Sequence, residues 1–184
     1  MRIVAQRVDL SDLEPAVRAV IARVIHASAD LEYASTMVVS PAAVAAGVAA
    51  VQAGAAVVTD GEMVRHGLSG CAAAHCYLTA TEGGDGITRS AAGMRVAAEH
   101  HPVGAVFVLG CAPTALMELI HLVAAGRLSP GLVIGTPVGF VGAAESKTAL
   151  RASGLPAITN VGEKGGSAVA AAAFNAVAGL AGRG

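Results

Sequence analysis

The densest group of residues that could do chemistry is a glycine-rich run that ends in charge. It reads GTPVGFVGAAESK over residues 135–147, and Glu145 and Lys147 are the only charges in this long neutral stretch. Gly139 and Gly142 would let the backbone lie close to a ligand because they carry no side chain. By composition alone, however, the better interpretation of the run is a capped helix with surface charges.

Two further loops end at a helix entrance, where free backbone N–H groups attract anions. The first, GCAPT over residues 110–114, places Pro113 and Thr114 at such an entrance. An ordinary turn with proline in the first helical turn explains the same pattern. The second, GEKGGS over residues 162–167, contains neither the Walker spacing nor G-x-G-x-x-G, so a nucleotide site is poorly supported.

Charged and titratable side chains add less specific candidates. Arg89, in the sequence Thr88-Arg89-Ser90, begins a helix and could either pair with a carboxylate through two hydrogen bonds or stay solvated. His26 follows the apolar end of a predicted helix, where a lone histidine is more often a dipole-stabilised surface group or a core residue than a catalyst. The histidines show no H-x-x-x-H or H-E-x-x-H spacing, so no metal site is predicted.

The elements that must position these residues alternate along the chain. Apolar residues at helical spacing predict a first long helix, with Ser11 as its cap, Glu14 as capping-box partner, and an end near 26–29. Further helices are predicted over residues 41–53 after Ser40, over a short stretch from the cap Asp60 to Gly67, and over 88–100, 115–125, 145–152 and 167–180. Strands are predicted over 36–39, 55–59, 71–78, 103–109, 132–134 and 157–159, with a turn over 82–86.

This alternation is typical of a mainly parallel sheet with helices on both faces. In such sheets, ligands bind in the crevice beyond the carboxyl ends of the strands. The rule points to the loops after Thr59, Leu109, Ile134 and Thr159, which hold the unusual residues. No internal repeat or linker is evident, so residues 1–184 are predicted to form a single domain.

Composition limits the class of protein. Hydrophobic residues make up 54% of the chain but aromatics only 3%, so the core must be built from Ala, Val, Leu and Ile. A net charge of −1 without a block of like charges predicts no nucleic-acid partner. The apolar runs are short or interrupted compared with the roughly 20 residues of a spanning helix, so no membrane association is predicted. Three cysteines without C-x-x-C, and no signal-peptide pattern, favour reduced thiols in the cytoplasm.

Taken together, these segments resemble the precorrin-8X methylmutase family, also described as cobalt-precorrin-8 methylmutase. Each motif is weak alone, but the set is specific because its members follow in the family's order over about residues 20–180. They are Val24-Ile25-His26, Thr59-Asp60-Gly61-Glu62-Met63-Val64, Thr88-Arg89-Ser90-Ala91-Ala92, Ala112-Pro113-Thr114-Ala115-Leu116, the run 137–147, and Lys164-Gly165-Gly166-Ser167 with Asn175.

The resemblance implies a fold, a reaction and partners. The family fold is a three-layer α/β/α sandwich, flavodoxin-like, with a five-stranded, mainly parallel sheet, and it forms a homodimer with sites near the subunit interface. The family's isomerase reaction moves a methyl group from C-11 to C-12 of precorrin-8X, or of cobalt-precorrin-8. The product is hydrogenobyrinate, or cobyrinate, in cobalamin biosynthesis. Substrate and product are thus tetrapyrroles, and no cofactor is implied.

The resemblance also assigns roles to residues. His26 inherits the catalytic role, because protonating a ring nitrogen makes the conjugated system more electrophilic and an imidazole is suited to give and retrieve that proton. Arg89, Lys147 and the helix N-termini after Gly110 and Gly166 would bind the carboxylate arms of the substrate. The full implied substrate-binding set is Asp60, Thr88, Arg89, Ser90, Pro113, Thr114, Gly139, Glu145, Lys147, Gly165, Gly166 and Ser167.

Three departures from the family pattern keep other interpretations open. The chain begins late relative to the family, whose additional N-terminal helix bears a substrate-contacting serine. Cys111 stands where asparagine is usual, and Glu163, an anion, stands where arginine is usual. The main alternative is therefore a divergent relative that binds a tetrapyrrole without turning it over. A flavodoxin-like phosphate or nucleotide binder is a weaker one, because it rests on fold alone.

Overall fold

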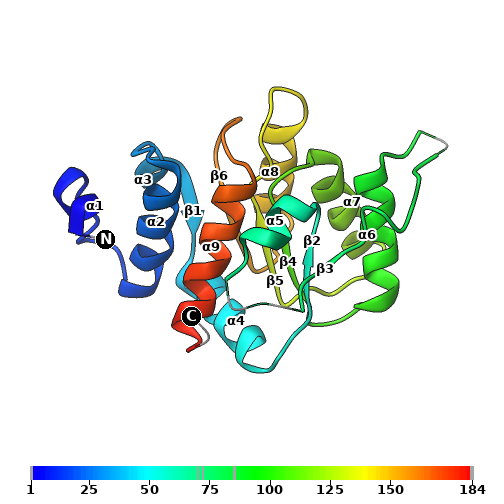
Figure 1. The fold of residues 1–184 in the computed structure, drawn as a ribbon, viewed down its shortest axis with the longest axis horizontal. Coiled ribbons are helices and arrows are strands. Elements are labelled where there is room, and N and C mark those ends of the chain that lie inside the picture. Colours follow the sequence, from blue (N-terminus) through cyan, green and yellow to red (C-terminus); the bar gives the residue numbers. More distant parts are fainter. Residues whose placement is uncertain (1, 70, 72, 85, 183–184) are drawn as a thin grey trace.

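The computed structural model describes residues 2–69, 71, 73–84 and 86–182 (Figure 1). Over these residues it contains nine helices and six strands. The helices are α1 (Arg2–Arg7), α2 (Pro15–Ser28), α3 (Tyr33–Thr36), α4 (Pro41–Gln52), α5 (Glu62–Gly67), α6 (Arg89–His100), α7 (Pro113–Ala124), α8 (Ala143–Ala152) and α9 (Ser167–Leu180). The strands are β1 (Met37–Val39), β2 (Val57–Thr59), β3 (His75–Cys76), β4 (Val106–Leu109), β5 (Leu132–Gly135) and β6 (Ala157–Asn160).

All six strands belong to one sheet, in the order β1-β6-β5-β4-β2-β3. Strands β2 to β6 are parallel to one another, whereas β1 pairs antiparallel with β6, with Met37 opposite Asn160. The sheet therefore has six strands where five were expected, and it is mainly parallel, as the alternation predicted. The additional strand, β1, supplies backbone partners to the outer side of β6, which would otherwise be an open sheet edge.

Helices cover both faces of the sheet, because successive strand side chains point to opposite sides. On one face, Val106, Val108 and Ile134 share a core with side chains of α2, α4 and α9. On the other face, Phe107 and Leu109 share a second core with side chains of α6, α7 and α8. Figure 1 shows α1 at the outer side of α2. No helix within the described residues is long and apolar enough to cross a membrane.

Several element ends match the local sequence signals. Helix α9 spans the predicted residues 167–180, and α4 begins after Ser40, whose hydroxyl accepts the Ala43 N–H at 3.1 Å. The predicted capping box of α2 is wrong. Ser11 lies four residues before the helix, its N–H donates to Asp9 Oδ1 at 2.9 Å, and Glu14 occupies the N-cap without a side-chain bond. A local turn has thus taken the residue that looked like a cap.

The strands are shorter than their apolar runs. Strand β2 begins at Val57 rather than at 55, and β4 begins at Val106 rather than at 103. Strand β3, at the side of the sheet, keeps only His75 and Cys76 of the predicted strand 71–78. Ala72 of that strand and Asp85 of the predicted turn 82–86 lie outside the described residues.

Candidate functional site at the carboxyl edge of the sheet

The carboxyl ends of the parallel strands meet at one edge of the sheet, called here the carboxyl edge. In Figure 1 the loops before α8 and α9 project from the same end of the molecule. The buried polar and charged side chains among the described residues lie at or just after these strand ends, or on α8 beside them. They are Thr59, Asp60, Thr136, Ser146, Lys147, Thr159 and Asn160. Buried polar groups need bonded partners, so this edge is where the fold specifies loop positions most closely.

Asp60 joins the loops that follow β2 and β4. Its Oδ1 accepts the Gly110 N–H at 3.1 Å, and its Oδ2 accepts the N–H groups of Cys111 and Ala112 at 2.7 Å each. Burial raises the pKa of this carboxyl group, and the donated hydrogen bonds oppose that rise. The sequence predicted that Asp60 caps α5, and this prediction is wrong. Gly61 occupies that N-cap, and Asp60 positions the entrance of α7 instead.

Two glycines hold the loop after β6 against the loop after β5. The turn 162–166 is called here the glycine turn. Its Gly166 N–H donates to Thr136 O at 2.8 Å, and its Glu163 O accepts the Gly139 N–H at 3.1 Å, so it is bonded to the loop after β5. Gly165 has a φ of +158°, and a β-carbon there would lie 2.8 Å from Pro137 O. The close approach of the two backbones therefore requires a residue without a side chain at this position.

The loop 137–142 ends in an apolar tip. Phe140 is 95% exposed and Val141 is 88% exposed, although the loop base is fixed by the backbone bonds to the glycine turn. The sequence run that suggested a ligand contact thus presents two uncovered apolar side chains beside the carboxyl edge. Glu145, in the first turn of α8, is exposed and has no bonded partner among the described residues.

Lys147 is buried beneath the glycine turn and does not reach solvent. Its Nζ donates to Lys164 O at 2.6 Å and lies 3.4 Å from Asn160 Oδ1. Burial lowers the pKa of Lys147 to about 8, which nearby Glu163 partly opposes. In this conformation the ammonium holds the glycine turn, so the predicted direct contact of Lys147 with substrate carboxylates stays a prediction.

The entrances of α6 and α7 lie side by side. The hydroxyls of Thr88 and Thr114 are 2.8 Å apart, and Thr88 also caps α6 by accepting the Ala91 N–H at 3.2 Å. Arg89 is exposed and its guanidinium has no bonded partner among the described residues, which leaves a cation open at this entrance. Ser90 follows it in the first turn of α6, and α7 begins at Pro113 rather than at the predicted residue 115.

The entrance of α9 lies against the loop after β4. Ser167, its first residue, has its Oγ 3.1 Å from Cys111 Sγ. Burial raises the pKa of the Cys111 thiol, and the carboxylate of Asp60 adds to that rise, so the thiol is held in its neutral form. Cys111 therefore joins two of the candidate loops as a neutral group, at the position where the resemblance led us to expect asparagine.

His26 is exposed on the last turn of α2. It lines a hollow of about 200 Å³ together with Ile25, Leu31 and Arg7 of α1. No hydrogen bond joins its ring to the other candidates within the described residues, so the imidazole is open to a ligand. Arg7 was not among the predicted site residues, because the short helix α1 that carries it shows no periodic pattern.

The predicted site residues thus fall into three joined groups and one separate group. Asp60 connects to the entrance of α7, Thr88 to Thr114, and the glycine turn to Gly139, whereas His26 stands apart on α2. Within the described residues, no three histidine, cysteine, aspartate or glutamate side chains are arranged to hold a metal ion.

Known proteins with similar sequences and structures bear on this site. A family model described as Precorrin-8X methylmutase matches residues 1–180. Cobalt-precorrin-8 methylmutase from Methanothermobacter thermautotrophicus is 43% identical over 178 residues, covering 94% of this chain and 84% of that relative. Precorrin-8X methylmutase from Pseudomonas aeruginosa is 43% identical over 173 residues, covering 85% and 80%. The crystal structure of precorrin-8X methylmutase from Thermus thermophilus superposes with a TM-score of 0.88 at 35% identity, covering 98% of this chain and 92% of that one.

Proposed function

The chain belongs to the precorrin-8X methylmutase family, and from this we propose that it is an isomerase of cobalamin biosynthesis. It moves a methyl group from C-11 to C-12 of precorrin-8X, or of cobalt-precorrin-8, to give hydrogenobyrinate or cobyrinate. The observation that carries the proposal is the family match over residues 1–180, supported by relatives of both names at 43% identity. The shift is intramolecular, so the reaction needs no redox cofactor.

The strand order supports a flavodoxin-like core for this site. Numbered along the chain, the five parallel strands β2 to β6 take the order 2-1-3-4-5, which is the flavodoxin-like order. Strand β1 is then an addition at the side of β6. In that fold the ligand lies where the order reverses, here between β2 and β4, and Asp60 joins the loops that follow these two strands.

His26 is proposed as the group that donates a proton to a ring nitrogen of the substrate. Its exposed imidazole is hydrogen-bonded to none of the described residues, so it is free to give and retrieve a proton. The carboxylate arms would bind Arg89 and the N–H groups at the entrances of α7 and α9, where Thr114 and Ser167 present hydroxyls. Asp60 and the glycines 139, 165 and 166 would set the positions of those entrances and loops.

Assembly and location are proposed on the family resemblance. A homodimer would place two such sites near one interface, and sedimentation of the purified protein would measure its mass. A cytoplasmic location agrees with Cys76 and Cys111, which are free thiols in the structure.

Purified protein incubated with precorrin-8X tests the function, with the absorption spectrum reporting hydrogenobyrinate. We expect conversion by the wild type and a loss of at least about 100-fold in kcat for His26→Ala, because the general acid is gone. His66→Ala is the matched control, since His66 also lies exposed on the last turn of a helix. Binding without conversion would overturn the isomerase proposal, and equal turnover by His26→Ala would overturn the role of His26.

A further inference from the structure

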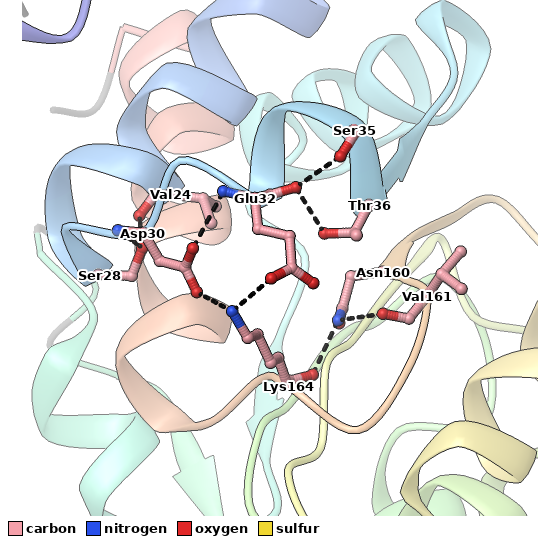
Figure 2. A network of polar contacts seen from close by, with 9 residues as sticks. All are labelled: Val24, Ser28, Asp30, Glu32, Ser35, Thr36, Asn160, Val161 and Lys164. Carbon is pink, nitrogen blue, oxygen red and sulfur yellow. Dashed lines mark hydrogen bonds and ion pairs between the residues drawn. The ribbon is translucent and has the colours of Figure 1, made fainter. Parts of the chain in front are cut away.

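One lysine fastens the end of α2 to the glycine turn. Figure 2 shows the Lys164 ammonium between two carboxylates, with Nζ 2.6 Å from Asp30 Oδ2 and 2.6 Å from Glu32 Oε2. Both acids belong to the loop that follows the last turn of α2. The ammonium holds the pKa of Asp30 below its ordinary value, so the pairing is between charged groups at neutral pH.

A chain of hydrogen bonds connects the last turn of α2 to those carboxylates. Ser28 Oγ donates to Val24 O at 2.9 Å and accepts the Asp30 N–H at 3.2 Å, and Asp30 Oδ1 accepts the Glu32 N–H at 3.0 Å. Asp30 thus uses one carboxylate oxygen for its own loop and the other for Lys164. A displacement of Asp30 would therefore be passed through Ser28 to the turn of α2 that carries His26.

The other end of the connection is buried. The carbonyl of Lys164 accepts the Lys147 ammonium at 2.6 Å and the Asn160 side-chain amide at 2.8 Å. Lys147 and Asn160 are both fully buried at the carboxyl edge. The backbone of Lys164 is therefore anchored to the part of the sheet that positions the loops after β5 and β6, while its side chain reaches α2.

We propose that Lys164 is a positioning residue, which sets the place of His26 relative to the carboxyl edge by clamping Asp30 and Glu32. This inference rests on the proposed function, because it assumes that His26 acts on a substrate bound at that edge. Within the described residues His26 has no hydrogen bond of its own to the other candidate loops. Helix α2 packs against α9 through the apolar core, and the double ion pair adds a polar connection from the loop after α2 to the glycine turn. The side chains of Lys164, Asp30 and Glu32 are 49%, 30% and 54% exposed, so the pairs contribute geometry more than stability.

The first test is Lys164→Met, with Lys164→Arg as the conservative variant. We expect kcat to fall roughly 10–100-fold in Lys164→Met while KM changes less than about twofold, because misplacing a catalytic group lowers the rate more than the binding. Lys164→Arg should recover most of kcat, since a guanidinium also bridges two carboxylates. A large rise in KM at unchanged kcat would show that Lys164 binds the substrate directly, and would overturn the proposal.

A second variant separates clamping from direct binding more sharply. The double substitution Asp30→Asn with Glu32→Gln removes the clamp but frees the Lys164 ammonium. Clamping predicts a fall in kcat similar to that of Lys164→Met, and no further fall when all three changes are combined. Unchanged or improved activity of the double variant would overturn the proposal. Arg95→Met is the matched control, because it breaks the 2.6 Å ion pair with Glu118, which joins α6 to α7, and it should leave kcat unchanged.

A readout without substrate keeps the inference separate from the proposed function. The ring signals of His26 in the nuclear magnetic resonance spectrum should change in chemical shift in Lys164→Met, return toward wild type in Lys164→Arg, and stay unchanged in Arg95→Met. Unchanged His26 ring signals in Lys164→Met would overturn the positioning role even if precorrin-8X is converted. A wild type that converts no precorrin-8X, but whose His26 signals respond to Lys164→Met, would overturn the isomerase proposal and leave the clamp in place.

Discussion

The carboxyl edge of the sheet and the opposite side of the molecule differ in how deeply their polar side chains are buried and in what they bond to. At the carboxyl edge, Asp60 and Lys147 are buried and bonded to backbone groups of loops far away in the sequence. Where α6 ends and β4 begins, a cluster of exposed or half-buried rings lies instead. There Tyr77 Oη is 2.8 Å from His101 Nε2, and the His75 and His101 rings are 4.6 Å apart.

The difference indicates which part of the molecule tolerates change. A buried polar group that loses its partner costs far more than an exposed one, because water cannot replace the bond. The carboxyl edge therefore has loops in one fixed arrangement, whereas the ring cluster can lose a member with little consequence. The following variants test this contrast, beginning with the largest expected effect.

Among these variants, Asp60→Asn should cause the largest loss of stability. The amide offers one acceptor oxygen where the carboxylate offers two, and its NH₂ group would face backbone N–H groups. We expect a loss of about 3 kcal/mol in the free energy of unfolding, measured by urea denaturation. Asp9→Asn makes the same chemical change at an exposed residue and should cost less than about 0.5 kcal/mol. Equal losses in the two variants would contradict the contrast.

Lys147→Met should change how stability depends on pH. The pKa of Lys147 is about 8 in the folded protein and 10.5 in an unperturbed chain, so the unfolded state binds more protons between these values. Raising the pH through that window should therefore stabilise the wild type relative to Lys147→Met, by up to about 3 kcal/mol. Urea unfolding of both proteins at pH 7, 8, 9 and 10 measures this difference, and a constant difference would contradict the effect of burial on this ammonium.

Val141→Ser and Val103→Ser compare two exposed valines. Val141 lies on the apolar tip of loop 137–142, and Val103, 76% exposed, lies just before β4 on the opposite edge. Both variants should keep the wild-type stability within about 0.5 kcal/mol. Only Val141→Ser should weaken binding of hydrogenobyrinate, by about fivefold, because an apolar side chain beside the ligand is covered on binding. Equal Kd values for the two variants in a spectroscopic titration would count against a ligand contact of this loop.

His101→Phe should have the smallest effect. Burial lowers the pKa of His101, and the neighbouring charges of His75 and His100 lower it further. Its folded pKa lies below the unfolded one, so wild-type stability should fall as the pH falls below about 6.5. His101→Phe should remove part of this dependence, shifting Tm at pH 5 relative to pH 7 by about 1–2 °C without changing kcat. A loss of activity would show that the two regions are coupled.

Local signals predicted much of the fold. The spans of α4, α6 and α9 depend on caps and periodic apolar residues that lie within each helix, so Ser40, Thr88 and the run 167–180 were enough to find them. The position of the candidate loops at one edge also followed, because parallel strands place their carboxyl ends together. Helices α1 and α3 are too short to produce a periodic pattern and were not predicted.

The parts that were missed depend on distant partners. Asp60 looked like a helix cap, but its carboxylate accepts hydrogen bonds from the N–H groups of residues 110–112. These residues lie 50, 51 and 52 positions later in the sequence. Lys147 looked like a surface charge on an amphipathic helix, and only packing beneath the glycine turn buries it. The antiparallel pairing of β1 likewise depends on the open side of β6, which no local pattern reveals.

The clamp on α2 also has a consequence for the order in which the molecule is built. The ion pair between Lys164 and Asp30 spans 134 residues, and the bond between Asn175 and Ser69 spans 106. A chain made from its N-terminus can form α2 early, but its carboxylate loop has no ammonium to bind until most of the protein has been synthesised. Contacts of such long sequence separation close late, because loop closure costs entropy before they are made. We therefore expect the end of α2 with His26 to mature last, so that a nascent or truncated chain has the helix but no working site.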